Sequence, residues 1–381
     1  SRMANPQPLD THINVKLKKT PQIEKLFKAA IKSDASDLHL KVGMPPKLRI
    51  HSKLKNTTGE PLSQEDIEEL VFEIMTEDQK QYFMENGTLD FAYQVGEMDR
   101  FRINAFRQRG YLSMVARRIS GRIPLFETLH LPTIVEKIAD NHDGLVLVTG
   151  PTGCGKTSTI ASMIDHINRT RASHIITIED PIEFLHVDKK SIVSQREIGI
   201  DVHNWLDALR TLMRQDPDVV VIGEMRDQQT VTAAMRAAET GHLVFGTLHA
   251  NNAAQTIQRL LDMFPQEERD LVRQTFAMSM RAIISQELLP GIRADVPRIP
   301  AVEVLINTPI IRKLISEERE GDIPGAIRAG SGEGMQNFTE SLRLLVEEEY
   351  IALKVAEQYA PNVEELKMAL KGIRSSTSGI L

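Results

Sequence analysis

The sequence predicts an α/β protein in which a smaller N-terminal α+β domain precedes a larger domain built on a parallel sheet. With 381 residues, the chain is long enough for two hydrophobic cores. Near residue 131 its pattern changes from short mixed elements to apolar runs that alternate with helical stretches, which is typical of a parallel sheet. The segment GPTGCGKT, residues 150–157, joins one such run to a helical stretch. A glycine-rich turn in that place is the usual position of a phosphate-binding loop.

The composition indicates a globular protein. Hydrophobic residues make up 41% of the chain and charged residues 26%, and the formal net charge is -6. This balance gives no overall attraction to nucleic acid or to an anionic membrane. Cys154 is the single cysteine, which excludes an intrachain disulfide and an all-cysteine zinc site. The single cysteine fits a reducing compartment best, so we expect a cytoplasmic protein. No uncharged apolar run reaches the roughly 18 residues of a membrane helix.

The N-terminal domain is predicted at 21–118, after a tag remnant and disordered tail at 1–20. One helix is expected to begin at Ser63, because Ser63 and Asp66 form a capping-box pattern before an amphipathic stretch. Three alternating segments indicate an antiparallel meander. In chain order the expected elements are a helix at 23–34, strands at 36–42 and 45–54, a helix at 63–75, and the meander strands at 89–95, 100–108 and 111–119.

A linker is predicted at 119–131, where turn formers and proline are frequent. The second domain follows at 132–372, and a disordered tail is expected at 373–381. Its apolar runs predict buried strands, and the chain after Asn307 is mainly helical in pattern. The expected strands are 145–149, 174–179, 218–224 and 242–249, and the expected late helices are 308–318, 323–330, 337–350 and 363–373.

The segment 150–157 matches the pattern G-x-x-x-x-G-K-[ST] in full, between a predicted strand and a predicted helix. In such a loop Lys156 would reach the β- and γ-phosphates, Thr157 would hold Mg²⁺, and the helix beginning at Lys156 would add its positive end. A glycine-rich turn without a ligand is the alternative, and the complete motif favours the phosphate site. The predicted nucleotide-binding residues are Gly150, Pro151, Thr152, Gly153, Cys154, Gly155, Lys156, Thr157 and Ser158.

Acidic side chains follow two of the predicted strands. Glu224 ends DVVVIGE, and Glu179, Asp180 and Glu183 lie in IEDPIEF. Carboxyl ends of parallel strands meet at one crevice, so these acids are expected near the phosphates. We predict a metal set of Thr157, Glu179, Asp180 and Glu224, and Glu183 as the group that activates water. Glu224 is the second candidate for that base, and a strand-end capping acid is its structural alternative.

A histidine and a group of arginines complete the candidate site. His249 ends the strand 242–249 beside Thr247, where a γ-phosphate sensor is expected, whereas His242 lies at the other end and is expected to contact a neighbour or the backbone. Residues 100–122 hold seven arginines and no acid. A solvated strand edge or a patch for anionic partners is one interpretation. The other is that arginine fingers reach the nucleotide of a neighbouring subunit, with Arg100, Arg102, Arg107 and Arg117 as candidates.

Four motifs in order resemble those of secretion ATPases: GPTGCGKT the Walker A motif, ITIEDPIEF the Asp box, DPDVVVIGEMRD the Walker B motif and AAETGHLVFGTLHANNA the His box. That superfamily powers type II and type IV secretion and type IV pili. SDLHL, RFRINAF and AIRAG narrow the resemblance to pilus retraction ATPases of the PilT type, over residues 23–373. The segment PRIPAVEVLINTPII and the acidic C-terminal extension are also similar to the accessory paralogue PilU, whereas AIRAG favours PilT.

The resemblance implies a RecA-like P-loop ATPase domain with a PAS-like N-terminal domain, assembled into a homohexamer. It further implies that ATP hydrolysis with Mg²⁺ drives pilus depolymerisation at the cytoplasmic face of the inner membrane. The implied partners are an inner-membrane platform protein and a paralogous pilus ATPase, with no nucleic acid. One cysteine speaks against the extension ATPases, which carry a tetracysteine zinc site. In the family, AIRAG is tied to retraction rather than to hydrolysis.

Two other functions remain open from the residues. A RecA-like nucleic-acid motor would use the basic segment 100–122, but the arginines are confined to that segment and the chain is acidic overall. A non-hydrolysing, regulatory nucleotide binder is the second alternative. Against it stand Lys156, Thr157, Glu183 and Glu224, which together supply the groups that hydrolysis requires.

Overall fold

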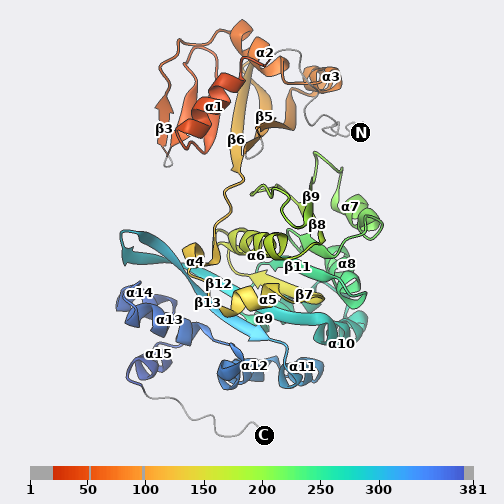
Figure 1. Cartoon of the computed structure of the whole chain (residues 1–381), viewed down its shortest axis with the longest axis vertical. Helices are drawn as coiled ribbons and strands as arrows, with labels where there is room; N and C mark the ends of the chain where they lie inside the picture. The colour runs from red at the N-terminus through yellow and green to blue at the C-terminus, as the bar shows by residue number, and fades with distance from the viewer. Residues whose placement is uncertain (1–19, 51–52, 97–98, 373–381) are drawn as a thin grey trace. The chain divides into compact units, whose positions relative to one another are not determined.

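The computed structural model describes residues 20–50, 53–96 and 99–372 (Figure 1). Spatial contacts divide the chain into two units. Unit 1 holds the residues up to Ile123 together with 178–187 and 195–210, and unit 2 holds 124–177, 188–194 and the chain from Thr211 onward. The predicted tails at 1–20 and 373–381 lie outside the described residues, apart from Thr20. The predicted domain boundaries stay predictions.

Unit 1 contains an antiparallel sheet with the strand order β3-β2-β1-β6-β5-β4. Every neighbouring pair in it is antiparallel, and β4, β5 and β6 form the predicted meander. The elements up to residue 120 are α1 (Glu24–Lys32), β1 (Asp37–Leu40), β2 (Lys47–Ile50), β3 (Lys53–Asn56), α2 (Gln64–Phe72), α3 (Glu77–Asn86), β4 (Thr88–Val95), β5 (Asp99–Gln108) and β6 (Tyr111–Ser120).

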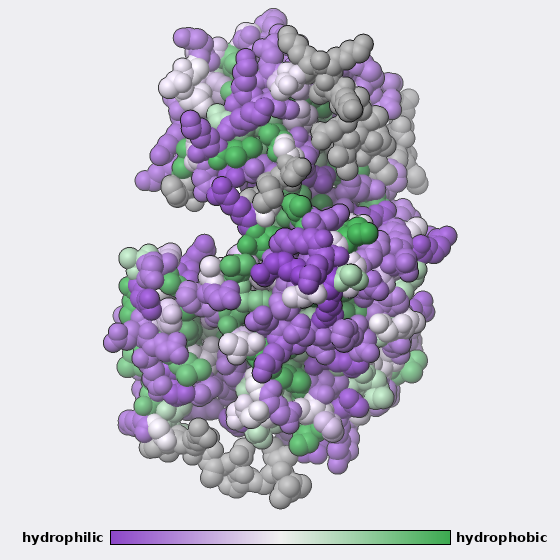
Figure 2. Space-filling view, viewed as in Figure 1, coloured by the Kyte–Doolittle hydropathy of each residue, from purple (hydrophilic) through white to green (hydrophobic). Residues whose placement is uncertain are grey.

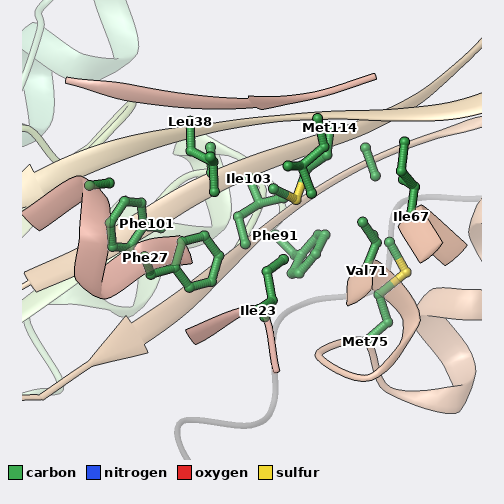
Figure 3. Packing of buried hydrophobic residues seen from close by; sticks show 14 of the residues in the cluster. Ile23, Phe27, Leu38, Ile67, Val71, Met75, Phe91, Phe101, Ile103 and Met114 are labelled. Atoms are coloured by element: carbon green, nitrogen blue, oxygen red, sulfur yellow. The ribbon is translucent and has the colours of Figure 1, made fainter. Parts of the chain in front are cut away.

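Capping boxes at the N-termini of two helices and a packed apolar core stabilise unit 1. The predicted capping box is confirmed: the Ser63 hydroxyl accepts from the N–H of Asp66 at 3.1 Å, and the Asp66 carboxylate accepts from the N–H of Ser63 at 2.7 Å. Helix α3 begins with an equivalent pair, Thr76 and Gln79, which was not predicted. Between the helices and the sheet, the rings of Phe27 and Phe101 stack with centroids 4.4 Å apart (Figure 3).

The second sheet has the strand order β13-β12-β7-β11-β10-β8-β9. Strands β7, β11 and β10 run parallel to one another, as predicted. Strand β12 adds a further parallel neighbour to β7, and β13 returns antiparallel to β12. That long hairpin and the edge strand β9 were not predicted. The strands are β7 (Gly144–Thr149), β8 (His174–Glu179), β9 (Ile192–Glu197), β10 (Val219–Ile222), β11 (Leu243–Leu248), β12 (Met280–Arg293) and β13 (Val296–Ile306).

Helices flank this sheet, and the late part of the chain is helical as predicted (Figure 1). The helices of unit 2 bury an apolar face against the strands, with β7 apolar along its length up to Thr149. The helices are α4 (Phe126–Leu129), α5 (Ile134–Ala139), α6 (Lys156–Thr170), α7 (Trp205–Leu212), α8 (Gln228–Glu239), α9 (Ala253–Asp262), α10 (Arg269–Ser279), α11 (Pro309–Ser316), α12 (Ile323–Ala329), α13 (Phe338–Glu347), α14 (Leu353–Tyr359) and α15 (Val363–Leu370).

The fold class is therefore the predicted one. A parallel-sheet core of the RecA-like P-loop kind is combined with a smaller N-terminal α+β domain. Hydrophilic residues cover most of the face shown in Figure 2. Among the described residues, no helix has the length and apolar character needed to cross a membrane.

Candidate active site

The phosphate-loop motif lies where the sequence predicted it, between β7 and α6. Helix α6 begins at Lys156, and Gly155 precedes it with a φ of 98°, a left-handed conformation that favours glycine. The ammonium of Lys156 donates to the carbonyl oxygens of Gly150 and Pro151, both at 2.9 Å. The lysine therefore lies over the loop, with the start of α6 directed at the same place. A helix N-terminus and a cation together form an anion site.

Close packing beneath the loop explains its first glycine. A Cβ atom at Gly150 would lie 2.3 Å from the backbone oxygen of Gln286 and 2.6 Å from the Sγ of Cys154. Cys154 is buried, and burial raises the pKa of its thiol. Thr159 of α6 also donates to the buried Gln286 side chain at 3.0 Å. The loop is thus fixed from below by β12, and Pro151, Thr152 and Gly153 are exposed above it.

Glu224 and His249 meet at the ends of neighbouring parallel strands. The Nε2 atom of His249 lies 3.2 Å from a carboxylate oxygen of Glu224, and Arg226 donates to the other oxygen at 2.7 Å. Thr247 holds this turn in place, because its hydroxyl donates to the Gly223 carbonyl at 2.5 Å and its own carbonyl accepts from the N–H of Met225. The roles of Thr247 and Arg226 were not predicted, since neither residue type in a single sequence signals such a contact.

One prediction and one unpredicted contact in this region can be compared with the structure. His242, at the opposite end of β11, lies 3.0 Å from the backbone oxygen of Ala237, so its expected backbone contact is confirmed. Asp227, which follows the Walker B-like strand, caps helix α8 through a capping box with Thr230.

The acids that follow β8 belong to unit 1, whereas the phosphate loop belongs to unit 2. Glu179 accepts from the Gln195 amide at 3.1 Å, and Asp180 and Glu183 are exposed. The N–H of Ile182, beside Glu183, donates to the buried carboxylate of Glu197 at 3.4 Å. The joint action of these acids and the loop at one nucleotide stays a prediction.

The four candidate finger arginines fall into two groups on the sheet of unit 1. Arg100 and Arg102 alternate with the buried Phe101 on β5, and Arg117 of β6 pairs in register with Arg102, so these three share one face. Arg102 lies 3.6 Å from Glu197, and Arg117 donates to Asp37 at 3.0 Å. Arg107 has the opposite parity on β5, and its guanidinium lies 5.6 Å from the ring centre of Phe83.

A magnesium ion bound with a nucleotide fits the residues present. The described residues contain no cluster of three or more His, Cys, Asp or Glu side chains that could hold a metal by themselves. Mg²⁺ does not need such a cluster, because phosphate oxygens and water complete a shell that the protein joins with one or two oxygens. The Thr157 hydroxyl in the first turn of α6 is one such oxygen, and the Glu224 carboxylate is a candidate for a contact through water.

Comparisons with known proteins agree with this geometry. The family model described as "Type II/IV secretion system protein" matches residues 16–295. The chain is 42% identical to the type IV pilus retraction ATPase PilT of Pseudomonas aeruginosa, over 89% of this chain and 98% of that protein. It is 37% identical to the type IV pilus ATPase PilU of the same organism, over 92% of this chain and 91% of that protein.

A solved structure shows the same arrangement. The crystal structure of the pilus retraction motor PilT with bound ADP matches with a TM-score of 0.82 and 44% identity, over 92% of this chain and 99% of that one. Both the sequence and the fold are thus shared along nearly the whole chain. The chain therefore belongs to the type II/IV secretion system protein family, in its branch of PilT/PilU-type pilus retraction ATPases.

Proposed function

We propose that this chain is a Mg²⁺-dependent ATP hydrolase that assembles as a homohexamer and powers the retraction of type IV pili. The observation that carries the proposal is the complete phosphate loop between β7 and α6, together with the Glu224–His249 pair at the ends of β10 and β11. The names of the relatives, a pilus retraction ATPase and a retraction motor with bound ADP, support the same activity and load.

Each group has a separate role in this proposal. The loop N–H groups and Lys156 bind the β- and γ-phosphates, and Thr157 supplies an oxygen to the metal, which neutralises phosphate charge when bound. Glu183 accepts a proton from the attacking water. Glu224 holds the water shell of the metal, and His249 senses the γ-phosphate, since both lie at the strand ends where ligands bind in parallel sheets.

The assembled ring supplies the remaining groups. Arginines from the face of Arg100, Arg102 and Arg117, or Arg107 beside them on β5, reach the nucleotide of a neighbouring subunit. ATP hydrolysis by this motor drives pilin depolymerisation at the cytoplasmic side of the inner membrane. An inner-membrane platform protein is its partner, and a paralogous pilus ATPase is a second one.

Lys156→Ala tests the hydrolase part of the proposal. The variant loses the cation that lies over the loop, so phosphate release should fall by at least about a hundredfold, and ATP binding should weaken. Lys137→Ala is the matched control, because Lys137 is an exposed lysine in the last turn of α5. Equal turnover of the two variants would contradict the assignment of the site.

A further inference from the structure

A row of buried polar side chains crosses three adjacent strands directly below the phosphate loop. Thr149, the last residue of β7, pairs in register with Ser285 of β12, and Ser285 pairs in register with Glu303 of β13. The relative exposures of these three residues are 0%, 0% and 7%. The hydroxyls of Thr149 and Ser285 lie 2.9 Å apart. Residues directly opposite one another point to the same face, so the row lies on one side of the sheet.

Glu303 binds the start of the helix that follows His249. One of its carboxylate oxygens accepts from the N–H of Ala253, the first residue of α9, at 2.9 Å. The hydroxyl of Thr256, in the same turn, lies 3.3 Å from that of Thr149. Helix α9 in turn holds the candidate sensor, because Arg259 donates to the backbone oxygen of His249 at 2.6 Å. The polar row thus fixes the helix start, and the helix fixes the backbone of His249.

The residues on either side of Glu303 bind the start of α13, in the C-terminal helical part. Burial raises the pKa of the Glu303 carboxyl group, and the backbone N–H of Phe338, the first residue of α13, acts to lower that pKa. The N–H of Val304 donates to the carbonyl oxygen of Gln336 at 2.8 Å, and the N–H of Gln336 donates to the carbonyl oxygen of Val304 at 3.2 Å. The Ser341 hydroxyl accepts from the N–H of Val302 at 3.0 Å. The beginning of α13 is therefore fastened to β13 on both sides of Glu303.

Burying a carboxyl group in a sheet costs desolvation free energy unless hydrogen-bond donors compensate for the lost water. Here the start of α9 supplies a backbone N–H group, and the positive ends of α9 and α13 favour negative charge. An apolar side chain at Glu303 would fill the space but would not hold the start of α9. The carboxylate therefore joins α9 to a segment of β13 that is itself bonded to the start of α13.

We propose that Glu303 is a positioning residue for ATP hydrolysis, which ties the segment carrying His249 to α13, so that the nucleotide site and the C-terminal helices move together. The catalytic consequence rests on the function proposed above. The mechanical link between the two segments does not, because it follows from the hydrogen bonds of Glu303 to α9 and of its neighbours Val302 and Val304 to the start of α13.

The test uses Glu303→Gln in the full chain, which keeps the size of the side chain but removes the carboxylate. Turnover should fall about tenfold or more, and the affinity for ADP should stay within about twofold of wild type, because the phosphate loop is unchanged. Hydrogen exchange should become faster in both 249–256 and 336–341, and it should not change in 150–158. Glu348→Gln, at an exposed acid just after α13, is the matched control and should behave as wild type.

Thr256→Val provides a second route, since it removes the hydroxyl that lies against Thr149 while keeping the shape of the side chain. It should lower turnover with unchanged ADP affinity, and the double variant should be no slower than the slower single variant. If Glu303→Gln fails to fold, Thr256→Val decides alone: unchanged turnover overturns the proposal. Exchange that accelerates in only one of the two segments also overturns it. A wild-type chain without ATP turnover would instead refute the proposed function, and the exchange experiment would still test the link.

Discussion

Replacing Glu303 by Gln should remove a pH-dependent part of the stability of unit 2. Burial raises the pKa of Glu303 to about 7 from an ordinary value of 4.5, although hydrogen bonds from the backbone of Ala253 and Phe338 act in the opposite direction. The folded chain therefore holds this proton more tightly than the unfolded chain. The resulting stabilisation is fully present below pH 4.5 and is lost as the pH rises to about 7. At about 1.4 kcal/mol for each pKa unit, the change amounts to about 3 kcal/mol.

Urea unfolding followed by far-ultraviolet circular dichroism measures this effect. The free energy of unfolding of wild type, relative to Glu303→Gln, should decrease by about 3 kcal/mol between about pH 4.5 and about pH 7.5. Glu348→Gln removes an exposed acid and should retain the wild-type pH dependence. If wild type and Glu303→Gln show the same pH dependence, the carboxyl group does not titrate in this range and the reasoning from its burial is wrong.

Three further variants test the roles assigned to the site. Glu183→Gln should bind ATP but hydrolyse it very slowly, because an amide cannot accept the proton of water; near-normal phosphate release would move the base role to Glu224. Subunits with Lys156→Ala, mixed with subunits that lack one of the four candidate arginines, should regain part of the ATPase activity, since finger and loop would lie on different chains; no recovery in any of the four mixtures would exclude trans fingers. Arg328→Ala loses an exposed ion pair with Glu365 at 3.1 Å, which contributes about 1 kcal/mol or less. Its turnover and hexamer size should persist while surface motility fails, and a parallel loss of turnover would show that AIRAG supports the fold instead.

Local patterns allowed much of the fold to be predicted. The capping box of Ser63 and Asp66 and the start of α6 at Lys156 depend only on residues close together in the sequence. Both lie at the positions that the sequence predicted. The hairpin of β12 and β13 was missed because prolines usually exclude a strand. Pro297 and Pro300 are tolerated because β13 is an edge strand, and Pro290 lies beyond the part of β12 that pairs with β7.

The candidate site was predictable only where one segment contains it. The phosphate loop is contiguous, so its residues identify it without a structure. Glu303 carried no such signal, because its donor is the N–H of Ala253, which lies 50 residues away along the chain in a separate helix. From the sequence, a buried acid in a strand cannot be distinguished from its alternating neighbours, because the helix start that binds it is known only from the fold. The same holds for Thr247, whose importance depends on the turn at Gly223.

The buried Cys154 makes this chain convenient for optical measurements. It is the single cysteine of the sequence, only 3% exposed, and burial raises the pKa of its thiol, so little thiolate is available to react with maleimide dyes. Cysteines introduced at exposed positions can therefore be labelled selectively without altering the phosphate loop. A dye pair on α9 and α13 would then report, in single molecules, how these helices respond to each nucleotide.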